Sequence, residues 1–209
     1  MESLAQMKEL TPYLRSSHYL NWEHPAVHSL ALALGAGANS DEDLARRCFL
    51  FVRDEIQHSW DHQKNPVTCR ASDVLEHKTG YCYAKSHLLA ALLRANKIPA
   101  GLCYQKLTFQ GDKAPYTLHG LNAVYLKRHG WYRIDARGNK TGVSADFCPP
   151  NEQLAFAISA PGEADLPEIW PEPLPIVTEL LERSQNYLEV AENLPDVPLV
   201  SGNLLRSMS

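Results

Sequence analysis

The sequence predicts an α+β domain in which one apolar helix packs against a small antiparallel sheet. Residues 82–96 are rich in alanine and leucine and contain no glycine or proline, which is typical of a buried helix. Beyond Pro99 the apolar residues recur with period two, over residues 102–109, 121–125 and 131–136. Consecutive strands indicate an antiparallel sheet, because successive parallel strands need a helical crossover between them.

Length and composition are those of one globular domain. The chain has 209 residues, of which 44% are hydrophobic, enough for a single core of ordinary size. We expect one domain over residues 1–209, with a helical extension at residues 1–42 interrupted by breakers such as Pro12 and Pro25.

Two helices are expected ahead of the apolar one. Ser40 precedes three acidic residues and an apolar periodicity that continues to Ile56, which predicts an N-capped helix of about four turns. Residues 71–76 predict a short helix, which ends before the break at Lys78-Thr79-Gly80.

Residues 148–209 predict a proline-rich extended segment that wraps around the domain, followed by a C-terminal helix. This tail holds nine of the chain's 14 prolines. Apolar residues from Ile176 to Leu188 recur at helical spacing, and Pro175 suits the first position of that helix. We expect the tail to cover the sheet or to form a wall of the functional cleft.

Charge and hydropathy exclude several function classes. The net charge is −4 and the pI about 6.1, so no basic field is expected to hold nucleic acid or an anionic membrane. Residues 1–10 lack the pattern of a secretory signal, and no run of about 18 apolar residues occurs. Five cysteines without a C-x-x-C pair favour a reducing cytoplasm.

Cys82 is the cysteine best placed for chemistry. It lies two residues after Gly80, at the first turn of the strongest predicted helix. Unpaired backbone N–H groups and the positive helix end stabilise a thiolate at such a position. An ordinary buried cysteine that happens to begin a helix is the alternative, and position alone leaves it open.

A cysteine nucleophile needs a base and a group that orients the base. His119 and Asp135 lie on neighbouring predicted strands and supply an imidazole and a carboxylate in that order. A regular hairpin turning at residues 128–130 would place His119 opposite Asn139, which leaves Asp135 roughly 13 Å away along the strand. We therefore expect a bulge, strong twist or irregular turn to close the gap.

Three sequence blocks resemble the transglutaminase-like superfamily, particularly its short bacterial members. Residues 79–100, TGYCYAKSHLLAALLRANKIPA, are similar to the motif in which G-x-C begins a helix that ends in L-L-R-A-x-G-I-P-A. The segments at His119 and at residues 131–135, WYRID, resemble the histidine and aspartate blocks, and residues 45–60 resemble the preceding helix. The resemblance covers about residues 43–147 and implies a papain-like core with a Cys82-His119-Asp135 triad.

The chain departs from the family pattern in three places. Lys97 replaces the usual glycine, Gly120 and Leu121 follow His119 where an aromatic residue is common, and His58 replaces the usual tyrosine. The tyrosine that would donate to the oxyanion is therefore missing. The Cys82 backbone N–H is the first expected donor, and the second is Gln57 or Trp60.

Further residues lie close to Cys82 in the sequence. Tyr81 and Tyr83 flank it and either line the pocket or only pack the start of the helix. Lys85 would lie near the same helix face, where we expect a solvated lysine. The cysteines and histidines match no tight metal-ligand spacing, so neither a metal nor another cofactor is expected.

These observations predict a cysteine-dependent hydrolase of amide or peptide bonds that forms a thioester acyl-enzyme. Its substrate would be a peptide or a small amide or ester, with no nucleic-acid or membrane partner. Two alternatives stay open: an acyltransferase, of transglutaminase type or acting on a carrier-bound substrate, and an inactive binding module. The sequence does not specify the oligomeric state.

Overall fold

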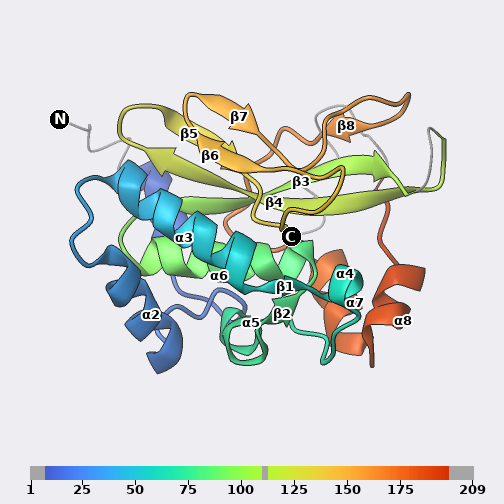
Figure 1. Ribbon diagram of the computed structural model, residues 1–209, viewed down its shortest axis with the longest axis horizontal. Coiled ribbons are helices and arrows are strands. Elements are labelled where there is room, and N and C mark those ends of the chain that lie inside the picture. The colour runs from blue at the N-terminus through green and yellow to red at the C-terminus, as the bar shows by residue number, and fades with distance from the viewer. Residues whose placement is uncertain (1–7, 110–112, 198–209) are drawn as a thin grey trace.

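A four-stranded sheet with a helix along one face forms the centre of the molecule (Figure 1). The structure is a computed structural model that describes residues 8–109 and 113–197. All strand pairs in this sheet are antiparallel, which confirms the predicted α+β class. The strand order is β5 (Gly130–Ile134), β4 (Tyr116–Leu126), β3 (Ala100–Thr108) and β8 (Ala164–Asp165).

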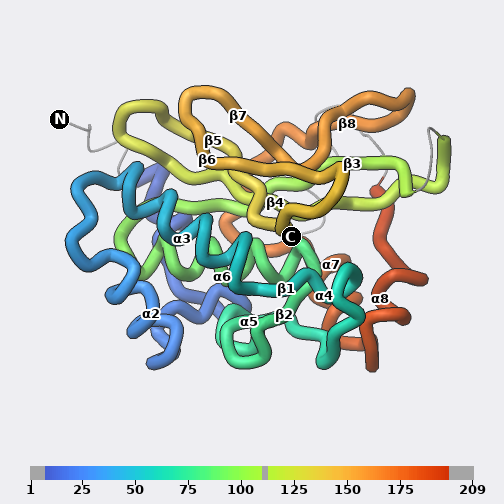
Figure 2. Tube along the Cα trace, in the orientation of Figure 1, coloured from blue at the N-terminus to red at the C-terminus, as the bar shows by residue number. Residues whose placement is uncertain are grey.

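Helix α6 (Cys82–Ala95) is the central layer. All 14 of its residues are buried, because the sheet covers one side and other helices cover the opposite side (Figure 2). Those helices are α2 (Pro25–Gly35), α3 (Asp41–Glu55) and α5 (Ala71–His77). No helix in the described part of the chain is long and apolar enough to cross a bilayer.

The predicted helix starts are largely confirmed. Ser40 caps α3, since its side chain accepts a hydrogen bond from the Asp43 N–H at 3.0 Å. Helix α5 begins at Ala71 as expected and ends one residue later than predicted, at His77.

Short elements connect these layers. They are the 3-10 helix η1 (Thr11–Leu14), helix α4 (Ser59–His62), the parallel pair β1 (Gln57–His58) and β2 (Thr79–Gly80), and the hairpin of β6 (Asp146–Cys148) and β7 (Asn151–Gln153). The parallel pair matters for the site because it places His58 beside Gly80, two residues before Cys82.

The C-terminal tail differs from the expected single helix. Pro175 begins α7 (Pro175–Arg183), as predicted, but the helical pattern is divided and a second helix follows, α8 (Tyr187–Glu192). The side chain of Asn186 accepts hydrogen bonds from the N–H groups of Leu188 and Glu189 and so caps α8 as a new helix. The tail contacts the sheet through β8 and through a bridge between Leu102 and Trp170.

Candidate active site

Cys82 is the first residue of α6 and lines a cavity of about 490 Å³. Its side chain is buried, and the N–H of Gly120 on β4 donates to its Sγ at 3.4 Å. A Cβ at Gly120 would lie 2.8 Å from a ring carbon of Tyr83 and 3.2 Å from the Tyr83 Cα. The glycine after His119 therefore lets β4 approach the first turn of α6, where a larger residue would collide with backbone.

His119 and Asp135 meet directly. The His119 Nε2 lies 2.7 Å from the Asp135 Oδ2, and the Cys82 sulfur is close enough to the same ring to raise its pKa. Asp135 is fully buried, and its carboxylate also accepts the backbone N–H groups of Arg137 at 3.1 Å and Ala155 at 3.0 Å. Phe156 packs its ring against the edge of His119, at 5.0 Å between centroids. The imidazole is thus fixed between a carboxylate and a thiol.

The β4–β5 register explains how His119 reaches Asp135, and it corrects the expected hairpin. Leu126 pairs with Gly130, so the turn occupies residues 127–129 and the register differs by two residues from the predicted one. Continued past β5, this register would place His119 opposite Arg137 and diagonal to Asp135. Diagonal neighbours lie within reach of long side chains, so no bulge is needed to join the pair.

His119 and Asp135 each shift the pKa of the other toward its charged form. Burial lowers the pKa of His119, but the Asp135 carboxylate and the Cys82 sulfur outweigh this effect and raise the pKa to about 10. Burial raises the pKa of Asp135, but His119 and the two backbone donors bring it below its ordinary value. A positively charged ring therefore lies beside the Cys82 sulfur at neutral pH.

The other predicted pocket residues separate into two groups. Trp60, Tyr81 and Tyr83 line the cavity together with Cys82 and His119. Gln57 lies outside the cavity lining and has an exposed side chain on β1. Its neighbour His58 lines the cavity instead, because side chains alternate along a strand.

A cationic group at one side of the cavity was not predicted from the sequence. Arg137 donates to Asp61 at 2.6 and 3.0 Å, and Lys140 donates to the same carboxylate at 2.6 Å. Burial raises the pKa of Asp61, but these two partners outweigh it and hold the pKa well below its usual range. Both cations line the cavity, and the buried His58 Nδ1 lies 3.8 Å from the Asp61 Oδ2.

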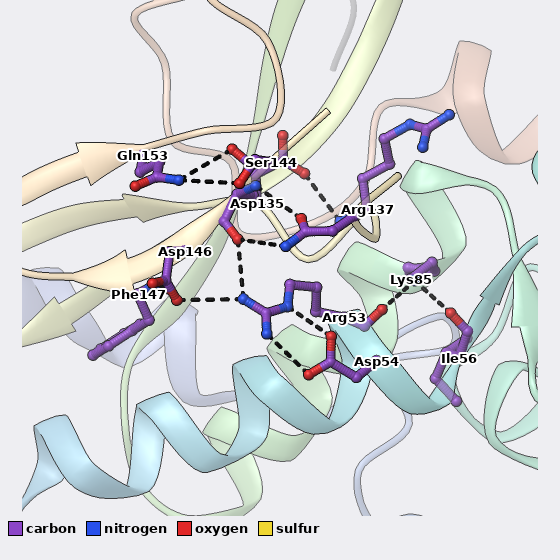
Figure 3. A network of polar contacts seen from close by, with 12 residues as sticks. Arg53, Asp54, Ile56, Lys85, Asp135, Arg137, Ser144, Asp146, Phe147 and Gln153 are labelled. Carbon is purple, nitrogen blue, oxygen red and sulfur yellow. Dashed lines mark hydrogen bonds and ion pairs between the residues drawn. The ribbon is translucent and has the colours of Figure 1, made fainter. Parts of the chain in front are cut away.

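Lys85 is buried, which contradicts the expected solvated lysine. Its Nζ donates to the backbone carbonyls of Ile56 and Arg53 at the end of α3 (Figure 3). Burial, followed by the charge of Arg137, lowers its pKa to about 7. Lys85 therefore connects α6 to the end of α3 behind the site and does not line the cavity.

A larger cavity of about 740 Å³ lies at the other end of α6. Asn96 and Lys97 are among its lining residues, whereas Cys82, His119 and Asp135 do not contribute to it. The smaller cavity is thus the one that the predicted nucleophile and base line. Within the described residues, no group of three or more histidine, cysteine or acidic side chains could hold a metal ion.

Comparison with known proteins places these residues in a family context. The family model of the transglutaminase-like superfamily matches residues 28–136, a range that includes Cys82, His119 and Asp135. A comparison with curated proteins finds no match.

Two solved structures are similar to part of the chain. One is named a "Putative Cysteine Protease" from Cytophaga hutchinsonii, with 22% identity, a TM-score of 0.49, and coverage of 62% of this chain and 42% of that one. The other is the periplasmic domain of TgpA from Pseudomonas aeruginosa, with 20% identity, a TM-score of 0.48, and coverage of 62% and 47%. The matched region spans less than half of each of these proteins.

Proposed function

Because the chain belongs to the transglutaminase-like superfamily, we propose that it is a cysteine-dependent hydrolase of amide or peptide bonds with Cys82 as the nucleophile. The observation that carries this proposal is that Cys82 and His119 line one cavity, with the His119 ring bonded to the buried Asp135 at 2.7 Å and its pKa raised by the Cys82 sulfur. A thiol, a base and a buried carboxylate in this order are the groups that acyl transfer through a thioester requires.

The first half-reaction forms a thioester. The Cys82 sulfur attacks the substrate carbonyl carbon while His119 holds the proton from the thiol. The Cys82 backbone N–H at the start of α6 faces the developing oxyanion, and Trp60 is the remaining candidate for a second donor. When the carbon–nitrogen bond breaks, His119 gives the proton to the leaving amine.

The second half-reaction restores the enzyme. His119 takes a proton from water, the hydroxide attacks the thioester carbonyl, and the carbon–sulfur bond breaks to release the acid. The thiolate and the protonated ring then return to their starting state. Asp135 keeps the imidazole oriented throughout, because its second oxygen is fixed by the Arg137 N–H.

Burst kinetics with p-nitrophenyl acetate test the proposal. We expect one equivalent of p-nitrophenol to appear rapidly, with the acetyl group on the Cys82 peptide by mass spectrometry. Limiting iodoacetamide between pH 5 and 9 should label Cys82 ahead of the other four cysteines, and His119→Ala should slow or shift both reactions. Labelling spread evenly over five cysteines, with no burst, would leave the inactive binding module as the function.

Added methylamine then separates hydrolysis from transfer. A hydrolase releases acetate at a rate that the amine barely changes, whereas an acyltransferase turns over faster and forms N-methylacetamide. Faster amide formation would replace the hydrolase assignment with the acyltransferase alternative.

A further inference from the structure

The C-terminal strap, residues 187–197, runs along the cavity and is held beside two members of the candidate triad, Cys82 and His119. The Tyr81 hydroxyl, next to Cys82, donates to the Tyr187 carbonyl. The Leu118 N–H, next to His119, donates to the Pro195 carbonyl at 2.8 Å. Between these two anchors, Ala191 and Leu194 line the cavity. The strap is therefore in contact with the site itself.

The anchor at Pro195 occupies a free edge of the sheet. Strand β5 pairs with β4 only as far as Asn122, so the same edge of β4 continues without a strand partner toward Tyr116. Backbone groups of alternate residues point to the same side of a strand. Along this edge the Leu118 N–H bonds to Pro195, and two residues further the Gly120 N–H bonds to the Cys82 Sγ.

The geometry at this edge suits an extended main chain. The Leu118 carbonyl already accepts a hydrogen bond from the Tyr83 hydroxyl, so Leu118 offers an incoming chain its N–H donor. Pro195 matches this requirement, because it brings a carbonyl and has no N–H of its own. Any extended chain can supply the same carbonyl, which is how peptides add to sheet edges.

An ion pair anchors the strap at the residue after Pro195. The buried Lys106 donates to the Asp196 Oδ1 at 2.7 Å and to the Val197 carbonyl at 2.9 Å. The strap therefore presents an apolar residue to the cavity, a carbonyl to Leu118 and an acid to Lys106. The Asp196 side chain is 44% exposed, so this ion pair is weak enough to be exchanged for a competing one.

We propose that residues 194–197 occupy the binding place of an extended peptide substrate, which carries an apolar residue followed two positions later by an acidic one. This inference rests on the proposed function, since the substrate is the one that Cys82 would attack. The substrate chain displaces the strap, bonds through its carbonyl to the Leu118 N–H, and places its acidic side chain on Lys106.

Competition between the strap and a peptide probe tests this proposal. Two alkylating probes are compared on the full chain: iodoacetamide, and an iodoacetylated peptide with the strap sequence Asn-Leu-Pro-Asp-Val. Asp196→Lys breaks the ion pair with Lys106, and Glu192→Lys makes the same charge change at an exposed position of α8. We expect the ratio of peptide to iodoacetamide labelling at Cys82 to rise about threefold or more in Asp196→Lys and to stay constant in Glu192→Lys.

The outcomes separate this inference from the proposed function. An unchanged labelling ratio in Asp196→Lys overturns the inference. If neither probe labels faster, the strap is a fixed wall of the cavity; if both probes label faster by the same factor, the strap excludes them equally and does not occupy a peptide site. A peptide probe with lysine in place of its aspartate should show no rise in the labelling ratio in Asp196→Lys, because Lys106 would repel its charge. Failure of the proposed function is recognised separately, because iodoacetamide itself would then show no preference for Cys82. Asp196→Asn provides a second, milder variant with the same expected direction.

Discussion

The two ends of helix α6 differ in what their polar groups contact. At its N-terminal end, Cys82 lines a cavity where its sulfur, a charged imidazole and backbone donors face space that a ligand can enter. At its C-terminal end, the fully buried Arg94 donates to the carbonyls of Ala100, Arg15 and Pro171. At the Cys82 end the proposed function leaves hydrogen-bonding capacity for a substrate, whereas the Arg94 end uses it to join the N-terminal extension, β3 and the tail.

This difference separates activity from stability. Removal of the Cys82 sulfur should abolish chemistry and leave the fold intact, because the one hydrogen bond described for that sulfur is a weak one, from the Gly120 N–H at 3.4 Å. Changes at the Arg94 end should do the reverse. The predictions below test this contrast, beginning with the largest expected effect.

Replacement of the nucleophile has the largest expected effect. Cys82→Ala should lower turnover of p-nitrophenyl acetate by about 10⁴-fold, since the members of such a triad act as a unit. Cys103→Ala, a matched change at another buried cysteine, should keep the wild-type rate. Circular dichroism should show both variants folded. Turnover by Cys82→Ala within about tenfold of wild type would disprove the nucleophile assignment.

Arg94→Leu tests the opposite end. It leaves three carbonyls without their donor, among them that of the buried Ala100, and should lower the free energy of unfolding by about 3 kcal/mol or more. Urea unfolding measures the loss. Arg46→Leu, at an exposed position of α3, should change it by less than about 0.5 kcal/mol. Equal effects of the two variants would show that the buried guanidinium does not join these segments.

The His119–Asp135 pair should give stability a pH dependence. The folded pKa of His119 is about 10 and the ordinary value is 6.5, so the stabilisation is fully present below pH 6.5 and is lost as the pH rises through 10. Relative to His119→Gln, the wild type should lose roughly 1–3 kcal/mol between pH 7 and pH 10.5.

NMR titration of the His119 ring gives the direct measurement. In the wild type the ring should still be protonated at pH 8, and Asp135→Asn should lower its pKa because the neighbouring negative charge is removed. A ring that titrates near 6.5 in the wild type would contradict the charged pair.

Lys97 should give the smallest effect. It has φ +61°, the left-handed region that favours glycine after a helix, and its ammonium lies 4.9 Å from the centre of the Trp22 ring. Lys97→Gly relieves the backbone and loses the ring contact, so the free energy of unfolding should change by less than about 1 kcal/mol. Lys97→Ala keeps the strained backbone and should be about 1 kcal/mol less stable than the glycine variant. Equal stabilities in thermal unfolding would argue against strain at Lys97.

The central helix and the strands were predictable because their residues carry strong periodicity of their own. The run of alanine and leucine in α6 and the alternation in β4 need no knowledge of distant neighbours. The position of Cys82 at a helix start and the order of the three blocks also came from the sequence. The helix cap at Ser40 follows from a local rule in the same way.

Features set by distant partners could not be predicted. Lys85 can be buried because the carbonyls of Arg53 and Ile56, at the end of α3, accept hydrogen bonds from its ammonium, and nothing near Lys85 in the sequence indicates this. The β4–β5 register depends on where the turn closes, and an error of two residues changed the expected His119–Asp135 geometry. His58 and Leu194 enter the cavity through β1 and the strap, which lie far apart in the chain. Asn186 caps α8 and so separates the two helices of the tail, but nothing near it in the sequence distinguishes it from asparagines that cap no helix.

The complete burial of α6 has a consequence for hydrogen exchange. With all 14 residues enclosed, amides in the middle of this helix can meet solvent only when most of the molecule opens, so their exchange reports global unfolding. Helix α8, which has a single buried residue, can exchange through local opening. The proposed nucleophile therefore lies at the start of a helix whose middle should exchange only on global unfolding, while the segment along its cavity can open locally.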